Sequence, residues 1–566
     1  MKFSQMQYTR PDFDETNAKY QELLKNLKAS KTAEECFAVY KEINDFGEIV
    51  DSMFSLAYIR KTLNTNDEFY AAEHEYIDEI EPQLEEVLQE ISKALLESPF
   101  RKELEEAWGK LMFTNLEIDL KTFSPAIIED LQVENKLSTE YDDLMASAKI
   151  ELEGKELNLS QVRAYFQNKD RALREQAINA YSQWFLSKGE QLDNLFDSLV
   201  KIRTQIAKKL GYEKFTELGY YRMQRNCYDE KMVAKFREGV VKYIVPVVTR
   251  LKAEQAKRIG ATKIDIIDNS FSFPDGNPTP KGTPDEIFEH GKKMYGELSA
   301  DTSEFFNFLL ENELFDVLTR AGKEIGGYQT SIPMYKSPFI FANFNGTSDD
   351  IDVLTHEAGH AYAAYVAKDI YPSQLQHGGQ DVSEIHSMAM EFFTWPWMEG
   401  FFGEDTEKYY QNHLASCVDF LPYGVMVDEF QHLIYNNPDK TPKERQEMWL
   451  SLEEKYRPWL DKANIPFWTE GRSWQMQLHI YGLPFYYIDY CLAGVMALNF
   501  WALNQKDEES KNNQNEAWAK YKKLVSYAGT KTFVDLVTDS GLPSPFEPDN
   551  LKIVADMVID WLEAKA

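Results

Sequence analysis

Residues 347–360 read Thr347-Ser348-Asp349-Asp350-Ile351-Asp352-Val353-Leu354-Thr355-His356-Glu357-Ala358-Gly359-His360. A Thr-Ser pair followed by acidic residues is typical of a helix start, so we expect a side-chain cap from Thr347 or Ser348. In that helix His356 and His360 lie on one face, four positions apart, and can hold the same metal ion. Glu357 lies beside the first histidine and can take a proton from a water molecule activated there. The pattern predicts a catalytic metal site on a helix.

A catalytic zinc ion needs a third protein ligand and one open coordination position. The candidates downstream are Asp381, Glu384, His386 and Glu391. Glu384 and Glu391 are seven positions apart, so a helix over residues 382–395 would place them on one face. That helix could present Glu384 to the metal and Glu391 to a ligand imidazole as hydrogen-bond acceptor. The spacing alone leaves Asp381 as the less favoured alternative.

The composition predicts a folded, acidic protein. Hydrophobic residues make up 43% of the 566 positions and aromatic residues 14%, which is enough for a large core and excludes global disorder. The net charge of −32 would repel nucleic acids and anionic membranes, so we expect neither as a partner. The four cysteines are widely spaced with no CxxC pair, and the N-terminus shows no secretory signal, so we expect a cytoplasmic location.

Most of the chain has the apolar periodicity of amphipathic helices. This pattern covers residues 16–46, 69–96, 160–188, 190–209, 231–259 and 549–564. Segment 274–284, rich in Pro and Gly, predicts a surface connection before a helix that Thr283 caps. Segment 339–344 predicts either a core strand or an edge strand that offers its backbone to an extended ligand. The apolar segment 480–503 contains one charge, Asp489, and is interpreted as a buried helix rather than a membrane span.

Three motifs together resemble the thimet oligopeptidase / oligoendopeptidase F family of zinc peptidases. They are Phe344-Asn345-Gly346-Thr347, then His356-Glu357-Ala358-Gly359-His360, then Val382-Ser383-Glu384 with Glu391. The size is similar to that of the oligoendopeptidase F and Pz-peptidase branch, and the similarity runs from about residue 207 to 546. The resemblance implies one zinc ion per chain, held by His356, His360 and Glu384. It also implies that Glu357 is the general base and acid.

The family uses a histidine and two tyrosines on a late segment to bind substrate and stabilise the oxyanion. That segment here reads His479-Ile480-Tyr481-Gly482-Leu483-Pro484-Phe485-Tyr486-Tyr487-Ile488-Asp489-Tyr490. The resemblance assigns these roles to His479, Tyr487 and Tyr490, with Tyr486 as the alternative to Tyr487. The alternative, less favoured even without the zinc motif, is that these tyrosines are ordinary core aromatics. Three further histidines lack a partnered pattern and are interpreted as structural: His290, His413 and His432.

The resemblance further implies a mainly α fold, a large helical zincin-type peptidase whose two lobes surround a deep substrate channel with a small β-sheet near the active site. We expect a helical lobe over residues 1–195 and a catalytic region over residues 196–566. The expected reaction is zinc-assisted hydrolysis of internal bonds in short peptides, and the oligomeric state is left open. A zinc carboxypeptidase or aminopeptidase is one alternative. A non-catalytic peptide-binding scaffold is another, although no ligand or base is missing.

Overall fold

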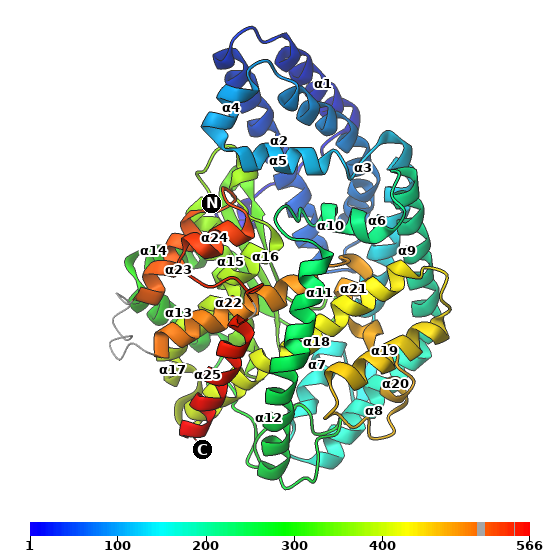
Figure 1. The fold of residues 1–566 in the computed structure, drawn as a ribbon, viewed down its shortest axis with the longest axis vertical. Coiled ribbons are helices and arrows are strands. Elements are labelled where there is room, and N and C mark those ends of the chain that lie inside the picture. The colour runs from blue at the N-terminus through cyan, green and yellow to red at the C-terminus, as the bar shows by residue number, and fades with distance from the viewer. Residues whose placement is uncertain (506–515, 548, 566) are drawn as a thin grey trace.

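The computed structural model describes residues 1–505, 516–547 and 549–565, and it is mainly α-helical, as expected (Figure 1). The first half contains α1 (Phe13–Ala29), α2 (Ala33–Leu63), α3 (Glu68–Leu96), α4 (Arg101–Trp108), α5 (Lys110–Asp119), α6 (Ile128–Ala146), α7 (Leu159–Ala164), α8 (Arg171–Ser187), α9 (Gly189–Lys209), α10 (Phe215–Arg222), α11 (Glu230–Gly239) and α12 (Val245–Arg258). The second half contains α13 (Pro284–Leu298), α14 (Ala300–Glu311), α15 (Asp349–Ala367), α16 (Gln380–Phe393), α17 (Glu399–Phe402), α18 (Thr406–Asn436), α19 (Pro442–Tyr456), α20 (Pro466–Thr469), α21 (Leu478–Gly482), α22 (Tyr487–Gln505), α23 (Glu516–Ser526), α24 (Phe533–Asp539) and α25 (Asn550–Lys565). The strands are β1 (Ile150–Leu152), β2 (Lys155–Leu157), β3 (Phe315–Leu318), β4 (Tyr328–Ile332) and β5 (Ser337–Phe344).

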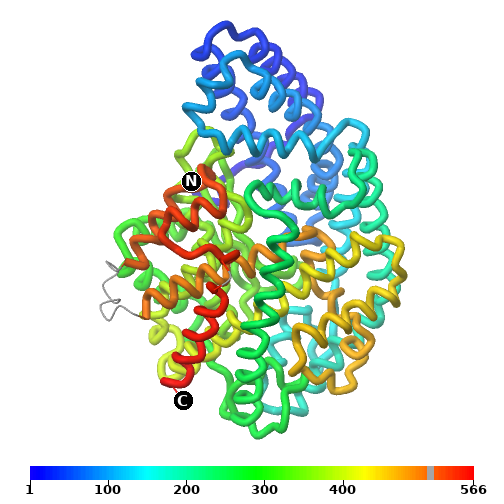
Figure 2. The backbone as a smooth tube through the Cα atoms, viewed as in Figure 1, coloured from blue at the N-terminus to red at the C-terminus, as the bar shows by residue number. Residues whose placement is uncertain are grey.

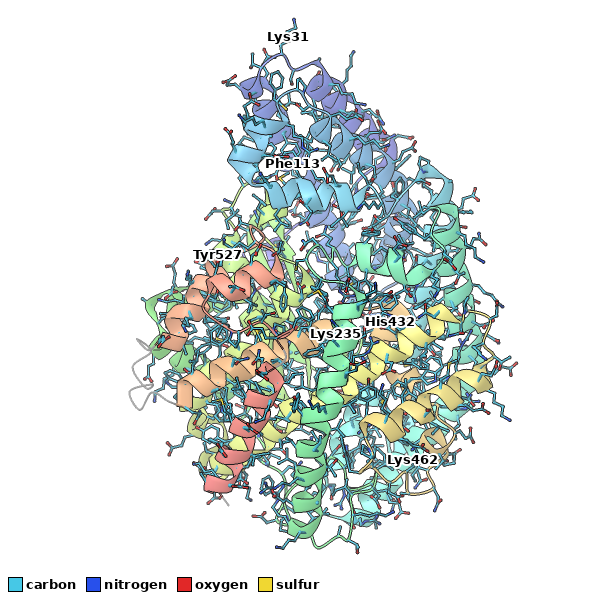
Figure 3. All side chains as sticks on the ribbon, in the orientation of Figure 1. Lys31, Phe113, Lys235, His432, Lys462 and Tyr527 are labelled. Atoms are coloured by element: carbon cyan, nitrogen blue, oxygen red, sulfur yellow. The ribbon has the colours of Figure 1, made fainter. Side chains whose placement is uncertain are left out.

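Helices α1, α2, α4 and α5 form the narrow end of the molecule at the top of Figure 1, and Lys31 marks its tip in Figure 3. Buried side chains of these helices and of α3, with Leu375, form one hydrophobic cluster, whereas the C-terminal half of α2 belongs to a second cluster that extends through the rest of the chain. The N-terminus lies in the broad body rather than at this narrow end (Figure 2), where the Phe3 N–H donates to Asn312 O at 2.8 Å. Helix α9 continues through residues 195 and 196, so no break in the backbone marks the expected lobe boundary.

The start of α13 is capped as the sequence predicts. Thr283 and Glu286 form a reciprocal capping box, with Pro284 in the first turn. The expected side-chain cap on α15 is wrong. Ser348 has helical backbone angles and makes no cap bond, while the Asp350 carboxylate accepts the N–H groups of Asn345 and Gly346, each at 2.8 Å. The acidic first turn thus folds back on the preceding loop and fixes the start of the helix that carries His356.

The small sheet near the site has the order β3-β5-β4. Strand β5 pairs in parallel with β3 and antiparallel with β4, so the aromatic run at 339–344 is a central core strand and the edge-strand alternative is wrong for it. The two edges of the sheet are β3 and β4, and residues of β4 line the cavity described below. Sequence pattern alone could not distinguish these cases, because both partners of β5 are separated from it by loops.

Helix α16 packs against both α15 and α22 in the middle of the molecule. A Cβ built on Gly359 would lie 2.6 Å from both His386 O and Ser387 Cα, so only glycine allows α15 and α16 to approach this closely. Helix α22 is buried along most of its length, which agrees with its interpretation as a core helix. None of the helices within the described ranges combines the length and the hydropathy of a membrane span.

Candidate active site

Helices α15 and α16 bring three ligand atoms together. Nε2 of His356 lies 3.2 Å, and Nε2 of His360 lies 3.4 Å, from Oε2 of Glu384. The three side chains form a group whose ligand atoms all lie within 4.8 Å of one another. Asp381, the alternative third ligand, lies outside this group, and its Oδ1 accepts the N–H of Val382 at 2.8 Å. The helical period therefore places Glu384, three positions after Asp381, toward the two imidazoles.

The electrostatics of this group suit a cation. Burial by itself would raise the pKa of Glu384, which is 1% exposed, but the His360 and His356 imidazoles hold it well below its usual range. Ser387 Oγ donates to Glu384 Oε2 at 3.0 Å, and the Tyr486 hydroxyl donates to Oε1. Two imidazole nitrogens and an ionised carboxylate are a donor set that fits zinc with one coordination position left open.

Glu357 lies beside this group as a carboxylate without a partner. It is 6% exposed, and its Oε2 has no hydrogen-bond partner among the described residues. Burial raises the pKa of its carboxyl group. A Cβ on Gly327 would lie 3.4 Å from Glu357 Oε1, so the loop before β4 passes directly over this carboxylate. A buried carboxylate oxygen left unsatisfied beside a metal-type donor set is arranged to accept a proton from a bound water molecule.

A chain of hydrogen bonds extends behind His356. Glu391 Oε1 lies 2.7 Å from His356 Nδ1, and Glu391 Oε2 lies 2.8 Å from His413 Nε2. The Trp395 indole N–H donates to His413 Nδ1 at 3.1 Å, which places the proton of a neutral His413 on Nε2, facing Glu391. Glu391 therefore lies where the sequence predicts, against the outer nitrogen of His356, and leaves His356 Nε2 free for a metal.

His413, which lacks a partnered pattern in the sequence, joins the hydrogen-bonded chain behind the site. It lies 22 positions after Glu391, on α18 rather than α16. A contact between two helices leaves no fixed spacing in the sequence, so only the fold could reveal it. Trp395, in the short turn after α16, was missed for the same reason.

The late segment contributes a histidine and two tyrosines to the site, and of the two alternatives, Tyr486 and Tyr487, the structure places Tyr486 in the cavity beside Tyr490. The rings of Tyr486 and Tyr490 lie 5.0 Å apart, and both side chains line the cavity at the three ligands. Tyr487 lines a neighbouring cavity instead. Tyr486 precedes α22, which begins at Tyr487, so the turn through Phe485 rather than helical spacing directs its side chain into this cavity.

His479 lies beside Tyr490, with its Nε2 3.3 Å from the hydroxyl oxygen. Gln477 Nε2 lies 2.9 Å from His479 Nδ1 and donates to it, so the imidazole proton sits on Nε2 and points to Tyr490. Burial lowers the pKa of His479 to about 4, which keeps it neutral. Tyr490 accepts this proton and keeps its own O–H for another acceptor.

These side chains face a cavity of about 620 Å³. Its walls come from both halves of the chain, since Tyr58 of α2 and Asp142 of α6 lie opposite α15 and the late segment. Strand β4 forms another wall through residues 328–331. The site is therefore enclosed by distant parts of the sequence, with an edge strand running along it.

Comparison with known proteins now assigns the chain to a class. Residues 3–123 match the model of the peptidase M3 N-terminal domain, and residues 300–552 match the model of peptidase family M3. The fold and the site thus define a helical peptidase, and the chain belongs to peptidase family M3.

Solved structures agree with this assignment over the full length. The chain is 46% identical to PZ peptidase A, solved with an inhibitor, with a TM-score of 0.97 over 100% of this chain and 99% of that one. It is equally identical to a Bacillus anthracis protein assigned as an oligoendopeptidase F, with a TM-score of 0.93 over 100% and 98% of the two chains. Oligopeptidase PepF of Bacillus subtilis is 20% identical over 298 residues, which span 52% of this chain and 44% of that relative.

Proposed function

We propose that the protein is a zinc-dependent endopeptidase that hydrolyses internal bonds of short oligopeptides inside an enclosed cleft. The observation that carries this proposal is the convergence of His356 Nε2, His360 Nε2 and Glu384 Oε2 beside the partnerless carboxylate of Glu357. The names of the similar proteins, which are oligopeptidases and PZ peptidase A, support the same substrate class.

His356, His360 and Glu384 would hold the zinc ion. When bound, zinc polarises the scissile carbonyl and makes a water molecule acidic enough to attack at neutral pH. Glu391 keeps His356 in the tautomer whose Nε2 is free, and His413 and Trp395 orient Glu391 in turn. Each of these hydrogen bonds involves a buried side chain, so the orientation of the His356 imidazole is fixed before substrate binds.

Glu357 would accept the proton of the attacking water and pass it to the leaving amine. The attack places negative charge on the former carbonyl oxygen, and the Tyr490 hydroxyl, which lines the same cavity, is the donor available to it, while the Tyr486 hydroxyl could serve only by leaving Glu384 Oε1. His479 positions Tyr490 through the 3.3 Å contact with its hydroxyl oxygen.

The cleft supports the restriction to short, extended peptides. The free edge of β4 can pair with a peptide backbone, which would give affinity without selecting particular side chains. Walls contributed by α2 and α6 as well as by the α15 region border the site, which would favour an extended peptide over a folded substrate. All four cysteines are unpaired, which fits a reducing compartment such as the cytoplasm.

The test uses a short peptide blocked at both termini, with products identified by mass spectrometry. The zinc-loaded protein should cut it at an internal bond, since neither free terminus is needed. Glu357→Gln should retain zinc, because Glu357 is not a ligand, yet lose about 10²-fold or more in kcat. Cleavage that requires a free terminus would indicate an exopeptidase, and normal turnover by zinc-loaded Glu357→Gln would remove Glu357 from its role.

A further inference from the structure

A second cavity, of about 640 Å³, adjoins the candidate active site. Four residues line both cavities and so mark the passage between them: Ile325, Gly326, Gly327 and Leu478. Aromatic side chains form part of the rest of its wall, among them Phe166, Tyr181, Phe420, Tyr423, Trp468 and Tyr487. A peptide extended along β4 past Glu357 would enter this space next.

Two arginines line the second cavity without a carboxylate partner. Arg163 is on α7 and Arg457 directly follows α19. Among the described residues neither guanidinium makes an ion pair or a side-chain hydrogen bond, and the buried Nε of Arg457 is left unsatisfied. The stacking of Arg457 over the Tyr423 ring, at 5.5 Å, is its one cation–π contact in this part of the chain.

The positive charges of Arg163 and Arg457 both act on Tyr423, which lines the second cavity. Burial raises the pKa of Tyr423, while the positive charges of Arg457 and Arg163 oppose the rise. The charge of Arg163 also acts on Tyr181 and Tyr487, on the same cavity wall. The two guanidiniums therefore converge on one region of the second cavity.

Arg163 is exposed and Arg457 is half-buried, in a chain with 93 acidic and 61 basic residues. Its deeply buried arginines are paired with carboxylates, as in Arg203–Glu134 and Arg225–Asp489, each at 2.7 Å. The acidic residues that line the second cavity are partly committed elsewhere. Asp419 pairs with Lys252 at 2.9 Å, and Asp350 accepts the backbone N–H groups before α15. Asp349, in the first turn of α15, also lines the cavity, but within the described ranges no ion pair joins it to either guanidinium, so both guanidiniums are left for an anionic ligand.

We infer that Arg163 and Arg457 form a subsite that binds a carboxylate of the peptide, an inference that rests on the proposed peptidase function. The shared chemistry is a carboxylate held by charge-assisted hydrogen bonds from guanidinium groups. It can come from the C-terminus of a short peptide or from an acidic side chain in its C-terminal half. The aromatic side chains of the cavity would contact the apolar part of the peptide residue that carries this carboxylate.

The direction of β4 favours the C-terminal half. Strand β4 starts at Tyr328, next to the shared wall at Gly327, and ends at Ile332, beside Pro333 of the first cavity. A peptide paired antiparallel to β4 runs the opposite way, so its C-terminal side points into the second cavity. Asp142 and Glu324 line the first cavity, and no arginine or lysine of the described residues does, so that end suits the ammonium terminus.

The test compares kcat/KM for two pairs of peptides. The first pair shares one sequence and ends in a free carboxylate or a carboxamide, while the second pair is amidated and carries Glu or Gln after the cleaved bond. The wild-type protein should favour the carboxylate member of at least one pair about 10- to 100-fold. The Arg163→Gln/Arg457→Gln variant should bring that ratio close to one. Discrimination in the first pair identifies the C-terminus as the source, and discrimination in the second pair identifies the side chain.

Controls separate this inference from the proposed function and from misfolding. Arg250→Gln, at an exposed surface pair on α12, should keep the wild-type ratio. Arg457→Glu, alone, should reverse the preference in favour of the amide. Calorimetric titration of the same peptides into Glu357→Gln measures the ratio as affinity, without turnover. Absence of internal cleavage would count against the proposed function only, whereas equal binding of acid and amide by Glu357→Gln, or a ratio that survives the double substitution, would overturn the subsite.

Discussion

Three neighbouring tyrosines differ in which cavity they face, and this difference makes a prediction at the scale of single residues. Tyr490→Phe and Tyr486→Phe remove a hydroxyl from the cavity that holds Glu357, so we expect kcat to fall about 10²-fold, or roughly 2.7 kcal/mol, at the one that faces the oxyanion. Tyr487→Phe removes the same atom from the neighbouring cavity and should leave kcat nearly unchanged. Steady-state kinetics of each variant on one blocked peptide identify the tyrosine that faces the oxyanion. The zinc content of each variant is measured in parallel. A damaging Tyr487→Phe beside two silent variants would restore the register expected from sequence.

Site residues that lie on the same helix could be predicted from the sequence. The pairs His356 with His360 and Glu384 with Glu391 repeat at helical spacing, so a single helix fixes each pair. His413 was not readable, because it meets Glu391 across two helices. The tyrosine register depends on where α22 begins, and a turn through Phe485, at φ 68°, sets that point. Motif spacing carries no information about such a turn.

At the scale of elements, the contact between α15 and α16 controls the metal site. In Gly359→Ala the new Cβ would meet the backbone of α16 at 2.6 Å, so the two helices must move apart. Glu384 moves with α16 and away from the two imidazoles. We expect a loss of about 1–3 kcal/mol in the free energy of unfolding, together with weaker zinc binding. Chemical denaturation and competition with a chelating dye measure the two effects.

Gly296→Ala in α13 is the matched control, because the nearest atom to its Cβ would be Ser303 Oγ, at 3.9 Å. This change should be neutral or stabilise the protein by up to about 1 kcal/mol, since alanine favours the helix. If Gly359→Ala bound zinc as tightly as the control does, the spacing of α15 and α16 would not position Glu384.

Helices were the elements best predicted from the sequence, because amphipathic periodicity is local. The expected pattern at 69–96 corresponds to α3, and that at 190–209 to α9. The pattern at 16–46 is divided between α1 and α2, where Thr32 caps the second helix. The position of β5 within its sheet was not predictable, because it depends on β3 and β4, which pair with it from outside the segment.

At the scale of the whole molecule, the enclosed cavities predict a limit on substrate size. A short peptide should be cut readily, while the same sequence placed inside a stably folded domain should resist, because residues of α2 and α6 line the cavity together with those of α15. Mass spectrometry of matched digests, with the host domain unfolded as a control, measures the ratio. Equal cleavage of the folded and unfolded hosts would indicate an open groove.

The expected division at residue 195 shows what sequence does not reveal at this scale. The N-terminal 200 residues have helical character only, and nothing local marks where their packing changes. In the structure Tyr141 stacks on Tyr481 at 3.9 Å, and Arg203 of α9 donates to Glu134, Tyr435 and the Tyr481 carbonyl. These contacts between residues far apart in the sequence join the segment at 128–209 to the late segment that carries His479.

The most direct test of a zinc peptidase is metal content measured together with internal cleavage. The protein should hold about one zinc ion per chain, lose cleavage of a blocked peptide on chelation, and regain it when zinc is returned. Glu384→Ala should lose zinc, and Asp381→Ala should keep it, because the structure brings only the first carboxylate to the two imidazoles. Full internal cleavage by the metal-free protein, or zinc lost from Asp381→Ala and kept by Glu384→Ala, would contradict the account.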